Sequence, residues 1–206
     1  SMPGVLSATA MSHPFITGWH NGTMLSSPEV EDGRPIEVWM NTVSPEFFAA
    51  FNIPVVAGRP FSPRDTASAP LVVVLNQTAA TRFFGSRLAV GRTLRRHAGD
   101  QVIQVEVIGV ARDAKYDSLR KSVQPTVFFP YAQDKAPFSG RAYAVRTGGD
   151  PAVLAGALRQ AISSIDRNLV PMDMKTQTRQ IEESLHQERL FATLLNAGRV
   201  RPSIVL

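Results

Sequence analysis

The chain contains no cysteine among its 206 residues. Disulfide frameworks, thiol catalysis and cysteine-ligated zinc sites are therefore excluded, while the redox compartment stays open because a cysteine-free chain suits any of them. Long apolar runs are lacking too: residues 70–75 (PLVVVL) are strand-sized, far short of the roughly 18–20 residues of a membrane-spanning helix. The start of the chain lacks the charged and apolar regions of a signal peptide, so Ser1-Met2 is interpreted as a cloning remnant before an excised domain.

Sequence signatures of common enzymes are missing as well. The chain has no P-loop, no dinucleotide-binding glycine pattern and no G-x-S-x-G motif. The histidines lack the spacing of a local metal site; they are His13, His20, His97 and His186. Asp113 and Asp117 offer an acid/base pair, but polar residues after a long strand favour a solvated turn. We therefore predict no catalytic residue, no cofactor and no metal, and do not expect an enzyme.

Positive charge exceeds negative charge, with 22 Lys and Arg against 17 Asp and Glu and a formal net charge of +5. The arginines are scattered along the chain, whereas nucleic-acid binding proteins gather them on one face. The densest basic run, residues 91–97 (GRTLRRH), contains no aromatic residue on which a base could stack. Single-strand nucleic-acid binding and an edge strand protected by charge are the two interpretations of this run; the second is favoured. No nucleic-acid partner is predicted.

The most regular passage is residues 43–65 (VSPEFFAAFNIPVVAGRPFSPRD), which follow a half-buried strand at 36–43 (IEVWMNTV) with alternating polarity. Ser44 is a suitable N-cap and Pro45 suits the first helical position, so a short helix is predicted with Phe47 and Phe48 on its apolar stripe. Pro54 prevents the helix from continuing, and a strand up to Gly58 is expected next.

A turn at Gly58 and Arg59 then leads into a proline-rich linker that contains Asp65. This passage offers no nucleophile, metal ligand or phosphate loop. Arg59 and Asp65 are predicted to form an ion pair, worth about 0–1 kcal/mol if exposed.

The rest of the chain alternates between strands and helices. An apolar strand at 70–75 precedes Asn76, the predicted N-cap of a helix that ends at Gly85. Further strands are predicted from Gly91 to residue 97, at 102–113, 125–133, 141–148 and 170–176, with a hairpin turn between the first two. Helices are predicted after Asp150, with Pro151 behind it, and over 177–196; residues 12–33 are expected to be a loop. This order indicates an α+β chain with a discontinuous first subdomain and a β-rich insert.

Six phenylalanines occur as adjacent pairs, at 47/48, 83/84 and 128/129. In each pair one ring is expected in the core, and the second is expected to cover a neighbouring element or to form an exposed contact; core packing is the favoured interpretation of the pairs. The helix at 177–196 becomes apolar nearly all round after residue 189, which is typical of a helix entering a protein core or a bilayer.

The stretches VSPEFFAAFNIPVVAGRPFSPRD, VEVIGVARDAKYDSLRKSVQPTVFFPYAQ and TRQIEESLHQERLFATLLN together resemble the periplasmic core domain of MacB/FtsX-like ABC-transporter permeases. The subgroup they are most similar to is the acidobacterial type, and the likeness extends from about residue 3 to residue 196. After LLN the family continues into a membrane helix, whereas this chain ends in the basic AGRVRPSIVL. Residues 197–206 are therefore interpreted as a foreign tail.

The resemblance implies a porter-like α+β subdomain made of residues 1–60 and 135–196, with a β-rich, sabre-like subdomain inserted at 61–134. On this division, residues 43–65 are interpreted as a rigid corner between the two subdomains, bridged by the ion pair of Arg59 and Asp65. It implies a periplasmic domain of an inner-membrane protein that transmits movement driven by ATP hydrolysis, without catalysis of its own. Implied partners are the protein's own transmembrane helices, a cytoplasmic ATPase, a periplasmic adaptor or exported substrate, and a second copy in the full-length protein. The isolated domain is expected to be a monomer. The alternatives are a stand-alone peptide- or lipid-binding module that uses the paired aromatics, and a hydrolase with an unrecognised site.

Overall fold

The computed structural model describes residues 2–17, 20–29, 33–85, 88–115, 122–134, 141–169, 171 and 173–186. The strands are β1 (Val5–Met11), β2 (Asn21–Ser26), β3 (Ile36–Val43), β4 (Val55–Gly58), β5 (Val72–Asn76), β6 (Thr93–Ala98), β7 (Gln101–Ala111), β8 (Thr126–Pro130) and β9 (Ala142–Thr147). The helices are α1 (Phe47–Ala50), α2 (Gln77–Phe84), the 3-10 helix η1 (Tyr131–Gln133) and α3 (Pro151–Ile165). Residues 177–186 are also helical. No helix in these described segments is long and apolar enough to cross a membrane.

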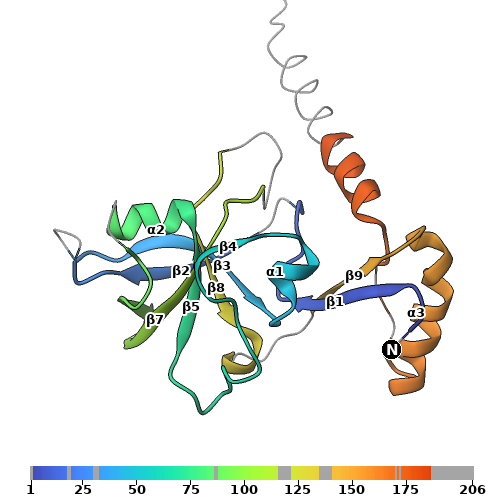
Figure 1. Ribbon diagram of the computed structural model, residues 1–206, viewed down its shortest axis with the longest axis horizontal. Coiled ribbons are helices and arrows are strands. Elements are labelled where there is room, and N and C mark those ends of the chain that lie inside the picture. Colours follow the sequence, from blue (N-terminus) through green and yellow to red (C-terminus); the bar gives the residue numbers. More distant parts are fainter. Residues whose placement is uncertain are drawn as a thin grey trace, which may run out of the picture.

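Six of the strands close into a barrel. The sheet runs in the order β2-β6-β7-β5-β8-β3-β1-β9. The six strands from β2 to β3 in this order form a closed ring, because β2 also pairs with β3. The β3–β8 and β5–β7 pairs are parallel, and the other pairs around the barrel are antiparallel. β4 pairs with residues 109–111 of β7, beyond the part of β7 that pairs with β6. Closure leaves these six strands without a free edge, which stabilises a β-rich unit against edge pairing. Figure 1 shows the barrel strands together, with α2 across one end.

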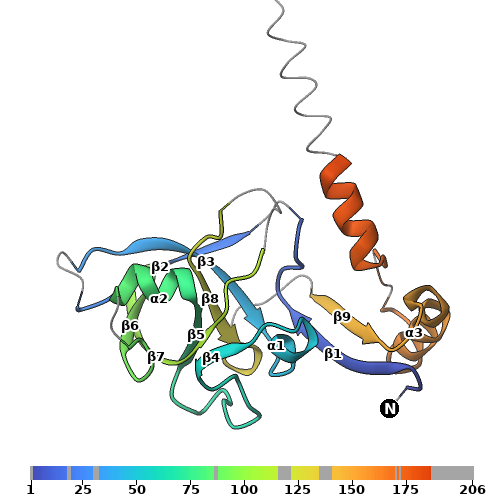
Figure 2. The same cartoon turned by 45° about the horizontal axis from the view of Figure 1, so that its top comes forward.

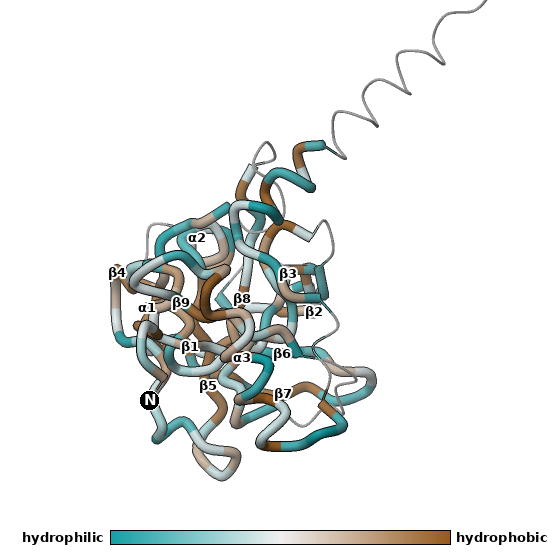
Figure 3. Tube along the Cα trace, turned by 90° about the vertical axis from the view of Figure 1, so that its right-hand side faces the viewer, coloured by the Kyte–Doolittle hydropathy of each residue, from teal (hydrophilic) through white to brown (hydrophobic). Residues whose placement is uncertain are grey.

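The barrel separates two hydrophobic cores. The inner core receives buried residues from all six barrel strands and from α2, so it fills the barrel: Leu25, Val38, Val73, Leu75, Ala79, Phe83, Phe84, Leu94, Val105, Val107, Val127 and Phe129 are among them. The outer core lies between the barrel wall and α1 and includes Val43, Phe47, Phe48, Val72, Val74, Ile108 and Phe128. Alternate residues of β5 and β8 therefore enter different cores, and both strands are buried along their whole length. In Figure 3 the hydrophobic residues gather along the strands in the middle of the molecule.

A smaller part of the chain extends from the barrel. β1 pairs with β9 along most of its length, but its pairing with β3 is the single register Met11↔Val43. Figures 1 and 2 show this two-stranded ribbon pointing away from the barrel, with α3 at its far end. α3 begins as predicted, with Asp150 Oδ1 accepting from Ala152 N at 2.9 Å and Pro151 at the first helical position. No α3 residue is fully buried, and Ile165 at its end is 80% exposed.

The α+β class is confirmed, as are most of the predicted elements. The predicted strand at 36–43 matches β3 at both ends, and the predicted hairpin turn joins β6 to β7. Two predictions are wrong. The segment 12–33 is not all loop, since it contains β2, and the described residues of 170–176 form no strand. The alternation of β2 is interrupted by Gly22, and its ladder partners β3 and β6 are distant in the sequence, so local polarity gives little sign of it.

The strand pairing can be compared with the predicted division of the chain into residues 1–60 with 135–196 and residues 61–134. β2, β3 and β4 of residues 1–60 pair with β6, β8 and β7 of residues 61–134. Hydrogen bonds therefore cross the boundary placed at 60/61, whereas β1, β9 and α3 lie apart from the barrel (Figure 1). The division itself stays a prediction. The tail at 197–206 and the apolar end of the last helix lie outside the described residues.

Candidate functional site

The residues singled out in the sequence lie mostly in one place, the 43–65 corner, between β3 and the loop that precedes β5. Helix α1 begins at Phe47, and its N-cap position is Glu46, which makes no side-chain capping bond. The predicted capping role of Ser44 and the predicted helical position of Pro45 are therefore wrong. Ser44 Oγ instead lies 2.9 Å from Thr9 Oγ1 and accepts from Ala10 N at 3.2 Å. Because Thr9 and Ala10 belong to β1, Ser44 ties the end of β3 to that strand.

Phenylalanine rings fill the space under α1. Phe47 is fully buried, and its ring centroid lies 5.6 Å from Phe15 and 5.5 Å from Phe128. The Phe48 ring meets Phe128 edge-on at 5.2 Å and lies 6.0 Å from Phe61. Such tilted contacts are the favoured geometry of aromatic pairs. The corner is thus anchored in the outer core by large rings.

All six paired phenylalanines are buried, with exposed fractions between 0% and 7%. Core packing, the favoured interpretation of these pairs, is therefore confirmed, and none of the six rings forms an exposed contact. Phe128 faces the outer core and Phe129 the inner core, because a barrel wall has a core on each side. The aromatic groove needed by the stand-alone peptide- or lipid-binding module is therefore missing from these six rings.

The chain reverses direction at two left-handed positions. Asn52 has φ 54° after α1, as its residue type favours, and Pro54 follows as the helix stop, with its carbonyl accepting from Arg112 N at 2.8 Å. Gly58 has φ 70°, and a side chain there would collide with the backbone of Ile108 and Gly109. Only glycine allows this approach of β4 to β7.

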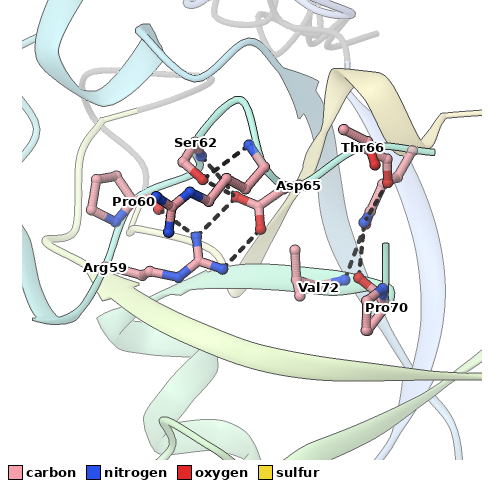
Figure 4. A network of polar contacts seen from close by, with 9 residues as sticks. Arg59, Pro60, Ser62, Asp65, Thr66, Pro70 and Val72 are labelled. Carbon is pink, nitrogen blue, oxygen red and sulfur yellow. Dashed lines mark hydrogen bonds and ion pairs between the residues drawn. The ribbon is translucent and has the colours of Figure 1, made fainter. Parts of the chain in front are cut away.

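Arg59 and Asp65 form the predicted ion pair, shown in Figure 4. Arg59 Nη1 and Nη2 donate to the two Asp65 oxygens at 2.9 and 2.8 Å, and Ser62 N donates to Asp65 Oδ2 at 2.7 Å. The Asp65 side chain is only 5% exposed, while that of Arg59 is 50% exposed. The Arg59 hydrogen bonds hold the pKa of Asp65 below its usual value, against the opposing effect of burial. The pair closes the loop from 59 to 65; its role as a bridge between subdomains stays a prediction.

A second polar clamp holds the loop that follows, also visible in Figure 4. Gln133, at the end of η1, donates from Nε2 to the carbonyls of Thr66 and Pro70 at 3.2 and 2.9 Å. Its Oε1 accepts from Val72 N at 3.1 Å. One side chain therefore satisfies three backbone groups, a role that no local pattern around Gln133 predicts.

Asn76 and Gly91 lie away from the corner, in the barrel. Asn76 caps α2 as predicted, with Oδ1 accepting from Ala79 N at 2.8 Å, and the helix ends at Gly85. The same Oδ1 also accepts from Thr126 N at 2.9 Å, so the cap joins α2 to β8. Gly91 has φ 83° and begins the approach to β6.

A buried polar network beneath the corner was not predicted. Asn41 is fully buried; its Oδ1 accepts from the backbone N of Ser12 and of His13, both at 3.1 Å, and its Nδ2 donates to His13 O at 2.8 Å. Burial lowers the pKa of His13, with a smaller contribution from His20. This network fixes the chain where β1 ends, next to β3.

Asp113 and His97, considered as a catalytic acid and a metal ligand, form hydrogen bonds with neighbouring side chains and backbone. Asp113 accepts from Thr78 N and Oγ1 at 3.0 and 2.7 Å, beside the start of α2, and Asp117 lies outside the described residues. His97 bonds to Ser26 Oγ at 2.8 Å. Within the segments that the structure describes, no three His, Asp or Glu side chains are grouped as metal ligands. Asp113 therefore helps to hold the start of α2.

The basic run does not form an edge strand, which corrects the favoured interpretation. β6 lies between β2 and β7 because β2 covers its outer side. Arg96 is directly opposite the core residue Leu25, and its guanidinium lies over the Phe129 ring at 4.6 Å from the centroid. Burial lowers the pKa of Arg96, opposed by Asp134. This arginine therefore packs against the inner core.

Comparison with known proteins agrees with this architecture. The sequence profile of the family of MacB-like periplasmic core domains matches residues 3–165 of this chain. The periplasmic region of MacB from Actinobacillus actinomycetemcomitans superposes with TM-score 0.59 at 16% identity, over 80% of this chain and 69% of that one. The extracellular domain of the noncanonic ABC-type transporter YknZ from Gram-positive bacteria gives TM-score 0.55 at 18% identity, over 81% and 77%. No curated protein matches the chain.

The two structural likenesses are too distant in sequence to show more than a shared fold. The family match, however, covers well over half of the chain, and it includes the barrel, the corner, β9 and α3. This chain therefore belongs to the family of MacB-like periplasmic core domains of ABC-transporter permeases.

Proposed function

We propose that this chain is the extracytoplasmic domain of an inner-membrane ABC-transporter permease and transmits ATP-driven movement to an exported substrate or a partner protein. The observation that carries the proposal is the way both ends of the described chain attach to the barrel. In a permease of this kind the two ends lead to membrane helices, so a displacement of either end would reach the barrel through these attachments. Membership of the acidobacterial-type subgroup stays a prediction.

The first attachment is β1. It is bound to β9 along its length and to β3 at its end, where Ser12 N donates to Thr42 O at 2.8 Å and Ser44 N donates to Ala10 O at 2.9 Å. The Ser44 side chain and the Asn41 network reinforce the same junction. A pull on β1 is therefore resisted by several hydrogen bonds at one point of β3.

The second attachment is the 177–186 helix. Ile181 packs against the outer core, and Gln180 Nε2 donates to Phe15 O at 2.6 Å. Phe15 itself stacks on Phe47 of α1. A tilt of this helix would therefore push on the corner, which is built on the barrel wall. In this proposal the rigid 43–65 corner passes the movement of the 177–186 helix to the barrel.

The domain is proposed to be non-catalytic, because its best-placed titratable groups are engaged in structural contacts: Asp65 with Arg59, and Asp113 with Thr78. It is proposed to work with its own transmembrane helices, a cytoplasmic ATPase and a periplasmic adaptor or exported substrate. The full-length protein is proposed to be a homodimer, and the isolated domain a monomer.

Spin labelling of the full-length permease tests this proposal. The chain has no cysteine, so Leu88→Cys on the barrel and Val153→Cys on α3, both about four-fifths exposed, each give one label per copy of this domain. The distance between copies is expected to change at both sites when ATP is bound. Unchanged distances at both sites, in a protein that hydrolyses ATP, would refute the proposal.

A coupling variant sharpens the test. Gln180→Ala combined with Ile181→Ala removes the hydrogen bond and the apolar contact of the 177–186 helix. The movement at Val153 should persist while the movement at Leu88 is reduced. Glu182→Ala, at an exposed neighbouring position, is the matched control and should behave as the wild type.

A further inference from the structure

A hollow of about 230 Å³ lies on the barrel surface, away from the 43–65 corner, between the end of β2, the start of β3 and the last turn of α2. It is lined by Ser27, Arg34, Ile36, Arg82 and Phe83. We propose that this hollow binds an acidic side chain of a partner polypeptide, with its carboxylate between the two arginines. This inference rests on the proposed function, which expects a protein adaptor or exported polypeptide.

The argument depends on the two arginines, because no acidic side chain among the described residues is paired with either of them. In the part of the chain that the structure describes, neither Arg34 nor Arg82 makes a side-chain hydrogen bond or an ion pair. Glu29, which follows Ser27 closely, is engaged by Arg92 in an ion pair. Arg92 also lies over the Phe84 ring. Among the described residues, the hollow therefore presents two guanidinium groups, while the nearby Glu29 is already bonded to Arg92.

The shape of the hollow favours a protein side chain. Its apolar residues, Ile36 and Phe83, can receive an aliphatic neighbour, while the arginines offer the paired donors that suit a carboxylate. Sites for whole small molecules are larger, roughly 300–1,000 Å³, and an acyl chain needs a longer apolar groove. A glutamate or aspartate next to a small aliphatic residue fits these dimensions.

A pair of dipeptides tests the proposal on the chain itself. Acetyl-Leu-Glu-amide is titrated while the backbone amide signals of Ser27, Ile36 and Phe83 are followed by NMR, and acetyl-Leu-Gln-amide is the uncharged counterpart. The glutamate peptide should shift these signals, and the glutamine peptide should bind about tenfold more weakly or not at all, since it lacks the charge-assisted hydrogen bonds. Equal binding of the two peptides, or no shift with either, would overturn the proposal.

Substitution of Arg34 and Arg82 tests whether these two side chains bind the carboxylate of the peptide. Arg34→Gln and Arg82→Gln should each weaken the glutamate peptide about tenfold, and the double variant should abolish its effect. Arg159→Gln, an exposed change on α3, should leave binding unchanged. Equal urea midpoints of variants and wild type separate loss of binding from loss of folding. Full binding by the double variant, or displacement of the peptide by phosphatidylglycerol vesicles, would overturn the proposal. The spin-label result is independent of these measurements, so each proposal can fail alone.

Discussion

Removal of the Asp65 carboxylate is expected to destabilise the domain more than removal of its partner Arg59. Asp65→Ala leaves Ser62 N without its acceptor in a nearly buried site, which costs about 1–3 kcal/mol. It also removes the ion pair, worth no more than about 1 kcal/mol because Arg59 is half exposed to solvent. The sum is roughly 1–4 kcal/mol for Asp65→Ala.

Arg59→Ala should cost about 1 kcal/mol, because Ser62 still donates to the carboxylate and water can take the place of the guanidinium. The free energy of unfolding is measured by urea denaturation for both single variants and for the double variant. The coupling between the two residues should be about 1 kcal/mol or less, the usual value for a solvent-screened pair.

The pH dependence follows from the lowered pKa of Asp65. A carboxyl group whose pKa is lower in the folded than in the unfolded state adds stability above its ordinary pKa. That contribution is lost as the pH falls below about 4, through the folded-state pKa. The wild type should therefore lose more stability on acidification than Asp65→Asn. If Arg59→Ala proves more damaging than Asp65→Ala, or if Asp65→Asn keeps the full acid sensitivity, the reasoning is wrong.

Three further changes probe the corner and the core beneath it. Gly58→Ala should cost more than about 2 kcal/mol in urea denaturation, because φ is positive and Ile108 blocks the side chain; Gly99→Ala, also at positive φ but in open space, should cost only about 1 kcal/mol. Phe47→Ala should lower the unfolding free energy by about 3–5 kcal/mol, since the ring is fully buried. If Phe47→Ala costs less than Phe51→Ala, which removes a half-buried ring, the central place of Phe47 in the outer core would be refuted. His13 should reduce stability as the pH falls below about 6.5, because its folded-state pKa is lowered; a His13→Gln variant with an equally steep pH dependence would rule this out.

The sequence predicted the local features well because their signals are local. Asn76, Asp150 and the Asn52–Pro54 stop act on backbone groups within a few residues, so their residue types determine their roles. Ser44 shows the limit of this reasoning. Its type suits a helix cap, but its hydroxyl is taken by Thr9 and Ala10 of a strand that is 34 or more residues away.

The closed barrel could not be predicted from the pattern of polarity. β5 and β8 are buried on both faces. This burial is expected in a parallel sheet covered by helices as well as in a barrel wall, so the apolar pattern of the two strands does not distinguish these folds. Closure depends on β2, a strand with weak alternation whose partners lie elsewhere in the chain. The hollow between Arg34 and Arg82 is equally non-local, because its two arginines are brought together only when α2 covers the end of the barrel.

The arrangement is consistent with the mechanical role proposed for the 43–65 corner. A closed barrel resists bending because each of its six strands is bonded on both sides, so it moves as one body. The ribbon of β1 and β9 is joined to that body at one register pair, and its position depends on the contacts around that pair. Ser44, the Asn41 network and the phenylalanines under α1 all lie at this junction. On the proposed function, weakening the junction should disconnect the membrane-side ends from the barrel while leaving the barrel folded.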